Sequence, residues 1–118
     1  MIELLKSKIH RAVVTDANIN YEGSITIGER LMESARILPY EKVTVVDIQN
    51  GNRFTTYAIK GKEDQSICVN GAAARLVSIG DQIIIMAYCF VNETDYKKSY
   101  EPRVLLVDSS NQIIKQEN

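Results

Sequence analysis

The sequence has very few of the residues on which most metal and hydrolase sites depend. It contains one histidine, two cysteines and no tryptophan. One histidine cannot supply a histidine-rich metal site, and Cys68 and Cys89 have no partner at zinc-ligand spacing. No GxGxxG, Walker, CxxC or HExxH motif is present. A triad of Ser24, His10 and Asp16 can be drawn on paper, but no nucleophile elbow surrounds the serine. We therefore expect no metal site.

The chain also lacks an excess of charge of either sign and any long apolar run. Lysine and arginine total 14, aspartate and glutamate 15, and the net charge is −1. This balance gives no basic field for nucleic acid or an anionic membrane. The apolar run at 83–87 is too short to span a bilayer, and residues 1–6 lack the apolar core of a signal peptide. We expect a cytoplasmic protein with buried, reduced cysteines, forming a single domain over residues 1–118.

Short alternating segments dominate the hydrophobic pattern. One helix is expected over 29–38, with Leu31, Met32, Ala35 and Leu38 on its buried stripe and Pro39 as its stop. A turn or helical cap is expected at 16–18, a hairpin at 50–52, one helical turn or a small loop at 70–75, and a polar loop at 92–101. Strands are expected at 2–15, 24–27, 42–48, 53–60, 66–69, 82–90, 103–107 and 112–115.

Many strands, one helix and no regular alternation of strand and helix argue against a doubly wound sheet. They favour a mainly β fold, a small closed or nearly closed barrel with short helices.

The bond between Gly23 and Ser24 is the feature with unusual chemical potential. A Gly-Ser pair is ordinarily a turn. This one precedes a strand, and glycine leaves its carbonyl uncrowded and within reach of the serine hydroxyl. That is the local requirement for an N-to-O acyl shift, in which the peptide becomes an ester. On the dipeptide alone, a simple turn remains the better interpretation.

Four segments together resemble the aspartate 1-decarboxylase family, whose members use a pyruvoyl group to make β-alanine for pantothenate and coenzyme A synthesis. They are Lys8-Ile9-His10-Arg11, Asn20-Tyr21-Glu22-Gly23-Ser24, 50–57 (Asn-Gly-Asn-Arg-Phe-Thr-Thr-Tyr) and 69–75 (Val-Asn-Gly-Ala-Ala-Ala-Arg). The Gly80-Asp81 turn is similar to the psi-loop turn of that family. The resemblance covers residues 1 to about 114 and implies a six-stranded double-psi β-barrel.

The resemblance implies self-cleavage between Gly23 and Ser24, giving chains 1–23 and 24–118. Ser24 would become the pyruvoyl group, the only cofactor, with no metal and no pyridoxal phosphate. This ketone would form a Schiff base with the amine of L-aspartate and accept the electrons left by decarboxylation. The resemblance also implies a homotetramer with sites between subunits. Whether a maturation helper is needed stays open.

The remaining site residues are carried over from the matching motifs. Tyr57 is the expected proton donor, and Thr56 positions the Gly23 carbonyl during processing and lies at the substrate site. Strand alternation puts these two neighbours on opposite faces, which a bulge or a site between subunits would reconcile. The expected substrate-binding residues are Lys8 and Arg53 for the two carboxylates and the backbone of Gly71, Ala72 and Ala73, with His10, Tyr21 and Asn70 lining the site.

Two positions depart from the family pattern, and two other functions stay open. Gly28 stands where an aspartate is common, and Arg36 where a glycine or small residue is common, both beside the expected helix. The alternatives are a pyruvoyl decarboxylase for another small amino acid, such as glutamate, and a non-catalytic double-psi barrel that binds a partner or small ligand. The presence of Lys8, Arg53, Thr56 and Tyr57 together argues against the binding module, which would have no need of this set.

Overall fold

The computed structural model describes all 118 residues, which form a mainly β fold with short helices. The two α-helices are α1 (Glu29–Ala35) and α2 (Glu93–Lys98), and η1 (Gly71–Leu76) is a 3₁₀ helix. The strands are β1 (Ile2–Val13), β2 (Asp16–Asn18), β3 (Ser24–Gly28), β4 (Lys42–Asp47), β5 (Arg53–Gly61), β6 (Ile67–Asn70), β7 (Gln82–Val91), β8 (Arg103–Val107) and β9 (Ile113–Glu117).

All nine strands belong to one mixed sheet with the order β2-β6-β3-β5-β4-β7-β1-β8-β9. Three neighbouring pairs are parallel, namely β1 with β8, β2 with β6 and β3 with β5. The two end strands, β2 and β9, do not pair with each other, so the sheet is not closed. The strand count of six is therefore wrong, and the closed barrel is not confirmed.

The core follows from strand alternation. Ile9, Ile25, Ile27, Ile83 and Ile85 are all fully buried, each separated by one residue from the next inward-facing position of its strand. Twenty buried hydrophobic residues form one continuous cluster. Because Ile25 and Ile27 anchor β3 in this cluster, the residues between and beside them are held in fixed positions.

Helix α1 is shorter than the hydrophobic pattern predicts. Leu31, Met32 and Ala35 are buried as expected, but the helix ends at Ala35 and Leu38 is 63% exposed. Arg36 adopts a left-handed conformation (φ 60°), and its N–H donates to the Glu33 carbonyl, so the local backbone ends the helix four residues before Pro39.

The N-terminal end of this helix explains one departure from the family pattern. A Cβ built on Gly28 would lie 2.1 Å from the Asp64 carbonyl oxygen, so the loop at 63–64 occupies the space of a side chain. Gly28 consequently offers no side-chain cap.

Two other predicted loops are regular elements. Residues 16–18, expected as a turn, form β2 because they pair with Cys68–Asn70 of β6, and this tertiary pairing overrides their weak strand propensity. Within the expected polar loop, Asn92 caps α2 by accepting a hydrogen bond from the Thr94 N–H. The hairpin at 50–52 is confirmed as the link between β4 and β5.

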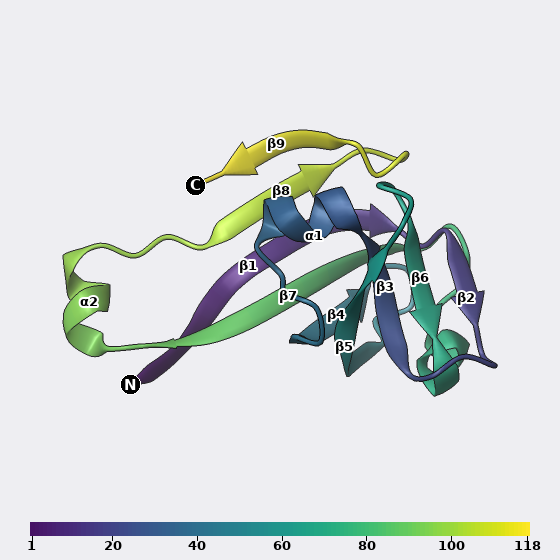
Figure 1. Ribbon diagram of the computed structural model, residues 1–118, viewed down its shortest axis with the longest axis horizontal. Coiled ribbons are helices and arrows are strands. Elements are labelled where there is room, and N and C mark those ends of the chain that lie inside the picture. The colour runs from purple at the N-terminus through teal and green to yellow at the C-terminus, as the bar shows by residue number, and fades with distance from the viewer.

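In Figure 1, β1 and β7 extend together from the body of the molecule toward α2, which lies at one end. The strands β2, β3 and β6 lie toward the other end, where the Gly23–Ser24 bond is found. No helix has the length and apolar character needed to cross a bilayer.

Candidate functional site

Ser24 belongs to a group of four polar residues on one face of the antiparallel strands β3 and β6. We call this group, Ser24, Thr26, Cys68 and Asn70, the polar quartet. Ser24 is opposite Asn70 and Thr26 is opposite Cys68 in the β3–β6 register. The alternate pairs, Ile25 with Val69 and Ile27 with Ile67, are fully buried on the other face. The strand alternation therefore separates an apolar face from a face that carries only hydrogen-bonding side chains.

The hydroxyl of Ser24 is buried and held by two hydrogen bonds. The side chain is 1% exposed. Its hydroxyl donates to the Glu22 carbonyl at 3.0 Å and accepts from Asn70 Nδ2 at 3.0 Å. A hydroxyl has one proton and two acceptor lone pairs, so this arrangement leaves one lone pair of Oγ unused beside the Gly23 carbonyl.

Asn70 is the centre of the quartet. It is 2% exposed, and its Nδ2 donates to Ser24 Oγ and to Thr26 Oγ1, each at 3.0 Å. Its Oδ1 accepts from the Cys68 thiol at 3.1 Å. Every polar atom of the Asn70 side chain thus has a partner.

Gly71 is pressed against the peptide that precedes Ser24. Its φ is +75°, and a Cβ built on it would lie 2.7 Å from the Cα and 2.8 Å from the nitrogen of Gly23. The same Cβ would lie 3.2 Å from the Tyr21 carbonyl oxygen. Only glycine fits both the conformation and the space. Tyr21 itself is exposed, and Ala72 and Ala73 continue from Gly71 into η1.

The parallel pairing of β3 with β5 places Ile25 opposite Ala58, the residue that follows Thr56 and Tyr57 in β5. The side chains of Thr56 and Tyr57 are half-buried, and the Tyr57 ring lies 6.2 Å from that of Tyr40.

Lys8 and His10 lie elsewhere in the chain. They share one face of β1, as their spacing predicts, and line a separate pocket of about 260 Å³ with residues of β8 and β9, including the ion-paired Lys115 and Glu117. Burial, with the charges of Lys8 and Arg11, lowers the pKa of His10, and its Nδ1 is buried without a partner. This imidazole is therefore neutral at neutral pH.

Arg53 is also apart from Ser24. It is exposed at the start of β5, four residues before Tyr57, and strand geometry separates their Cα atoms by about 13 Å. The single chain thus brings together Gly23, Ser24, Asn70 and Gly71, and Thr56 and Tyr57 directly precede the β5 residue opposite Ile25. It does not bring Lys8, His10 or Arg53 to this group.

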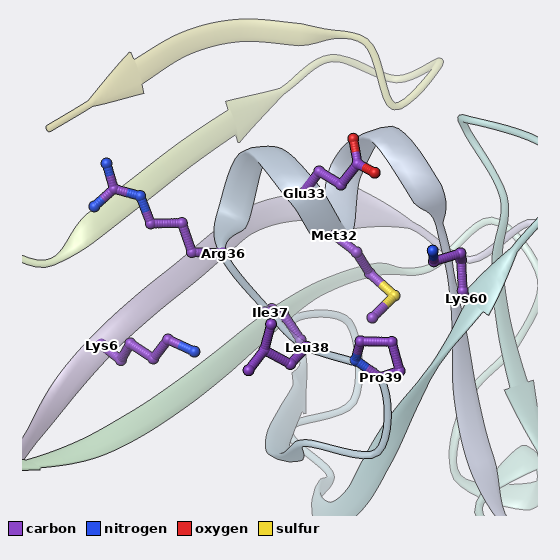
Figure 2. A pocket seen from close by; sticks show the side chains of 8 residues that line it. All are labelled: Lys6, Met32, Glu33, Arg36, Ile37, Leu38, Pro39 and Lys60. Atoms are coloured by element: carbon purple, nitrogen blue, oxygen red, sulfur yellow. The ribbon is translucent and has the colours of Figure 1, made fainter.

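The largest pocket has no residue of the Ser24 region. It measures about 540 Å³ and is formed by α1, the segment that follows it, and the lysines of β1 and β5 (Figure 2). It is lined by the apolar side chains of Met32, Ile37 and Leu38 and by charged side chains that include Lys6, Arg36 and Lys60. The largest pocket therefore does not coincide with the site that the motifs predict.

Sequence reasoning missed Thr26 and Cys68. The pattern predicts a strand at Thr26 and a buried, reduced thiol at Cys68; the thiol is free, half-buried and hydrogen-bonded to Asn70. The signal was present in the alternation of Ser24-Ile25-Thr26-Ile27 and Ile67-Cys68-Val69-Asn70, but it becomes informative only once the two segments are known to pair.

Comparison with known proteins matches the chain to one family over almost its whole length. The family model described as aspartate decarboxylase matches residues 1–114. The chain is 59% identical to the aspartate 1-decarboxylase of Caldicellulosiruptor saccharolyticus, covering 100% of this chain and 92% of that protein. It is 58% identical to the enzyme of the same name from Clostridium botulinum (99% and 92% covered) and 57% identical to that of Thermoanaerobacter pseudethanolicus (92% and 92% covered). The chain belongs to the aspartate decarboxylase family.

Proposed function

We propose that this protein is a self-processing, pyruvoyl-dependent decarboxylase that converts L-aspartate to β-alanine and carbon dioxide, as a step toward pantothenate. The observation that carries the proposal is the buried Ser24 hydroxyl, held between the Glu22 carbonyl and Asn70 directly after Gly23. A serine that served only as a turn would have no need of such a site. Membership of the family supports the substrate and the reaction.

Processing begins at the Gly23–Ser24 bond. Ser24 Oγ attacks the Gly23 carbonyl carbon, the C–N bond breaks, and an ester replaces the peptide. Loss of the Ser24 α-proton then expels the Gly23 carboxylate from Cβ and leaves a dehydroalanine at the new terminus. Addition of water releases ammonia and leaves the pyruvoyl group. The products are chains 1–23 and 24–118.

The residues around the bond are suited to this sequence. The two hydrogen bonds of Ser24 fix its side-chain rotamer, so the reacting atoms start in a defined orientation. We assign to Thr56 the positioning of the Gly23 carbonyl, which the β3–β5 register supports. Gly71 packs on the Cα of Gly23 and limits the freedom of the peptide that must react.

In the processed enzyme, the pyruvoyl group formed from Ser24 would supply an electron-accepting carbonyl for the substrate amine. The chain supplies the proton and the binding contacts. A tyrosine hydroxyl is neutral near pH 7, and Tyr57 would donate to the carbon that loses its carboxylate. The small residues Gly71, Ala72 and Ala73 would let the substrate approach the backbone closely.

We propose that the carboxylates of aspartate are held by Lys8 and Arg53, with His10, Tyr21 and Asn70 lining the site. Because Lys8 and His10 line a separate pocket of the single chain, this assignment requires a second copy to supply them. A homotetramer with sites between subunits meets that requirement.

A complementation experiment tests the shared site. Co-expression of Ser24→Ala with Lys8→Ala, each inactive alone, should restore about a quarter of the sites by random pairing. The double variant Ser24→Ala/Lys8→Ala, expressed alone, is the control, since no pairing of its subunits can form an intact site. If mixed oligomers form but show no activity above either parent, Lys8 and Ser24 act from the same chain.

Two further assignments belong to this proposal. Parallel pairing of β1 with β8 and of β3 with β5 supports the double-psi connection of the family, even though the strand order is open. Free thiols at Cys68 and Cys89 support a reducing, cytoplasmic location.

Intact mass and carbon dioxide release test the function. The purified protein should yield a fragment ending at Gly23 and a second fragment with a ketone in place of the Ser24 amine. Ser24→Ala should stay whole and inactive, while Ser110→Ala, at an exposed turn, should behave as the native protein. If carbon dioxide is released from glutamate but not from aspartate, the substrate is glutamate. A chain that stays whole after prolonged warming, even with cell extract added, and releases nothing would reduce the protein to a binding module.

A further inference from the structure

Asn70 can present either its amide nitrogen or its oxygen to Ser24, and the two choices differ chemically. When Asn70 Nδ2 donates to Ser24 Oγ, the Ser24 hydroxyl donates its own hydrogen bond to the Glu22 carbonyl, and one Oγ lone pair stays free to attack. A flipped amide would place an acceptor there, and the Ser24 proton would be drawn to Asn70. The orientation of this amide therefore decides whether the Ser24 hydroxyl donates to the Glu22 carbonyl or to Asn70.

We propose that Cys68 and Thr26 are positioning residues that lock the Asn70 amide with its nitrogen toward Ser24. The inference rests on the proposed self-cleavage at Ser24, and it gives a role to the two quartet members that the reaction itself does not use. Cys68 supplies a donor to Oδ1 at 3.1 Å, and Thr26 supplies a second acceptor for Nδ2 at 3.0 Å.

The strand register makes this arrangement rigid. Cys68 and Asn70 are two residues apart on β6, and Ser24 and Thr26 are two residues apart on β3, so all four side chains project from the same face. Ile25 and Val69, which alternate with them, are fully buried and hold both strands in register. A one-residue slip would expose these apolar side chains and separate the quartet.

The thiol is chemically suited to act as the donor. Burial, helped by the nearby Asp16 carboxylate, raises the pKa of Cys68 above its ordinary value, against a weaker opposing contribution from the Asn18 backbone. The sulfur consequently keeps its proton at neutral pH. In the flipped orientation this S–H would face the Asn70 NH₂ group, donor against donor, and Thr26 would have to rotate its own proton toward Oδ1.

The test measures the cleavage rate and the melting temperature of matched variants. Cys68→Ala removes the donor and should slow cleavage about three- to tenfold, the range expected for loss of one hydrogen bond. Cys68→Ser keeps a donor and should cleave within about twofold of the native rate. Cys89→Ala, at the other half-buried cysteine, should leave the rate unchanged.

Thr26 provides an independent pair of variants. Thr26→Val keeps the branched shape but removes the acceptor, and it should also slow cleavage, while Thr26→Ser should not. A purely structural role would move the melting temperature in step with the rate. The proposed role predicts that the serine variants recover the rate whatever small change in melting temperature they cause.

The outcomes separate this inference from the function on which it rests. If the native protein cleaves and Ser24→Ala does not, but Cys68→Ala and Thr26→Val cleave at the native rate, the positioning role is wrong and the self-processing stands. Equal slowing of Cys68→Ala and Cys68→Ser also overturns it. If the native protein never cleaves, both the positioning role and the proposed self-processing are wrong.

Discussion

Replacing Gly71 with alanine tests whether the contact between η1 and the Gly23 peptide controls processing. We expect the substitution to lower the free energy of unfolding for two reasons. The left-handed backbone at φ +75° costs an L-residue about 1–2 kcal/mol. The new Cβ would also stand 2.7 Å from Gly23 Cα, against the 3.4 Å at which ordinary contact begins, so the Gly23 backbone must move by about 0.7 Å. Overpacking of this kind costs about 1–3 kcal/mol.

Gly51 supplies a matched control for the first of these costs. Its φ is +76°, nearly the same as that of Gly71, but a Cβ there meets nothing within 4 Å. Gly51→Ala should therefore lose only the backbone cost of about 1–2 kcal/mol, while Gly71→Ala should lose about 2–5 kcal/mol. The difference between the two variants isolates the contact with Gly23.

The assay combines urea unfolding with the rate of cleavage. A displacement approaching 1 Å at a reacting group can slow a reaction by about 100-fold. We expect Gly71→Ala to cleave up to about 100-fold more slowly and Gly51→Ala to cleave at the native rate. If the two variants lose equal stability and cleave equally fast, the Gly71–Gly23 contact has no influence on processing.

Two further predictions concern stability. Arg36→Gly should raise the free energy of unfolding by about 1 kcal/mol relative to Arg36→Ala in urea titrations, because glycine adopts φ 60° without strain; equal values would show that the conformation costs nothing. Burial, with the nearby Asp81 carboxyl, raises the pKa of Asp47, so the folded state holds this proton more tightly than the unfolded state and stability falls as pH rises through the raised pKa. Asp47→Asn cannot ionise, and its amide can donate to Asp81, so its melting temperature should rise relative to that of the native protein as pH increases above about 4, the ordinary pKa of an aspartate; parallel curves would contradict this.

The strands and the core were largely predictable because they depend on local alternation. Ile25 and Ile27 of β3 are both fully buried, as the alternation of this strand predicts. Elements that depend on distant partners were not predictable. Residues 16–18 form a strand only because β6 lies beside them, and Asn111 is buried because its side chain bonds both Val13 backbone groups and the Gln65 carbonyl.

The candidate site also has a part that depends on adjacent residues and a part that depends on distant ones. The motif around Gly23 and Ser24 suffices to predict self-cleavage, since an acyl shift involves adjacent residues, and this stays a prediction. Its surroundings come from β6 and β5, whose pairing with β3 joins residues more than 30 positions apart. Local spacing cannot reveal such contacts, and it likewise could not show that Lys8 and Ser24 are apart within one chain.

The two glycines at the site have different physical reasons to be glycine. A Cβ on Gly23 would meet nothing within 4 Å, so packing does not exclude a side chain at the bond itself. A Cβ on Gly71 would strike the backbone of Gly23 and Tyr21. The steric demand for a small residue therefore lies on the loop that contacts the bond, and any requirement at Gly23 must come from access of Ser24 Oγ to its carbonyl. Within the single chain, Gly71 packs against Gly23, and Asn70 hydrogen-bonds the serine that follows it.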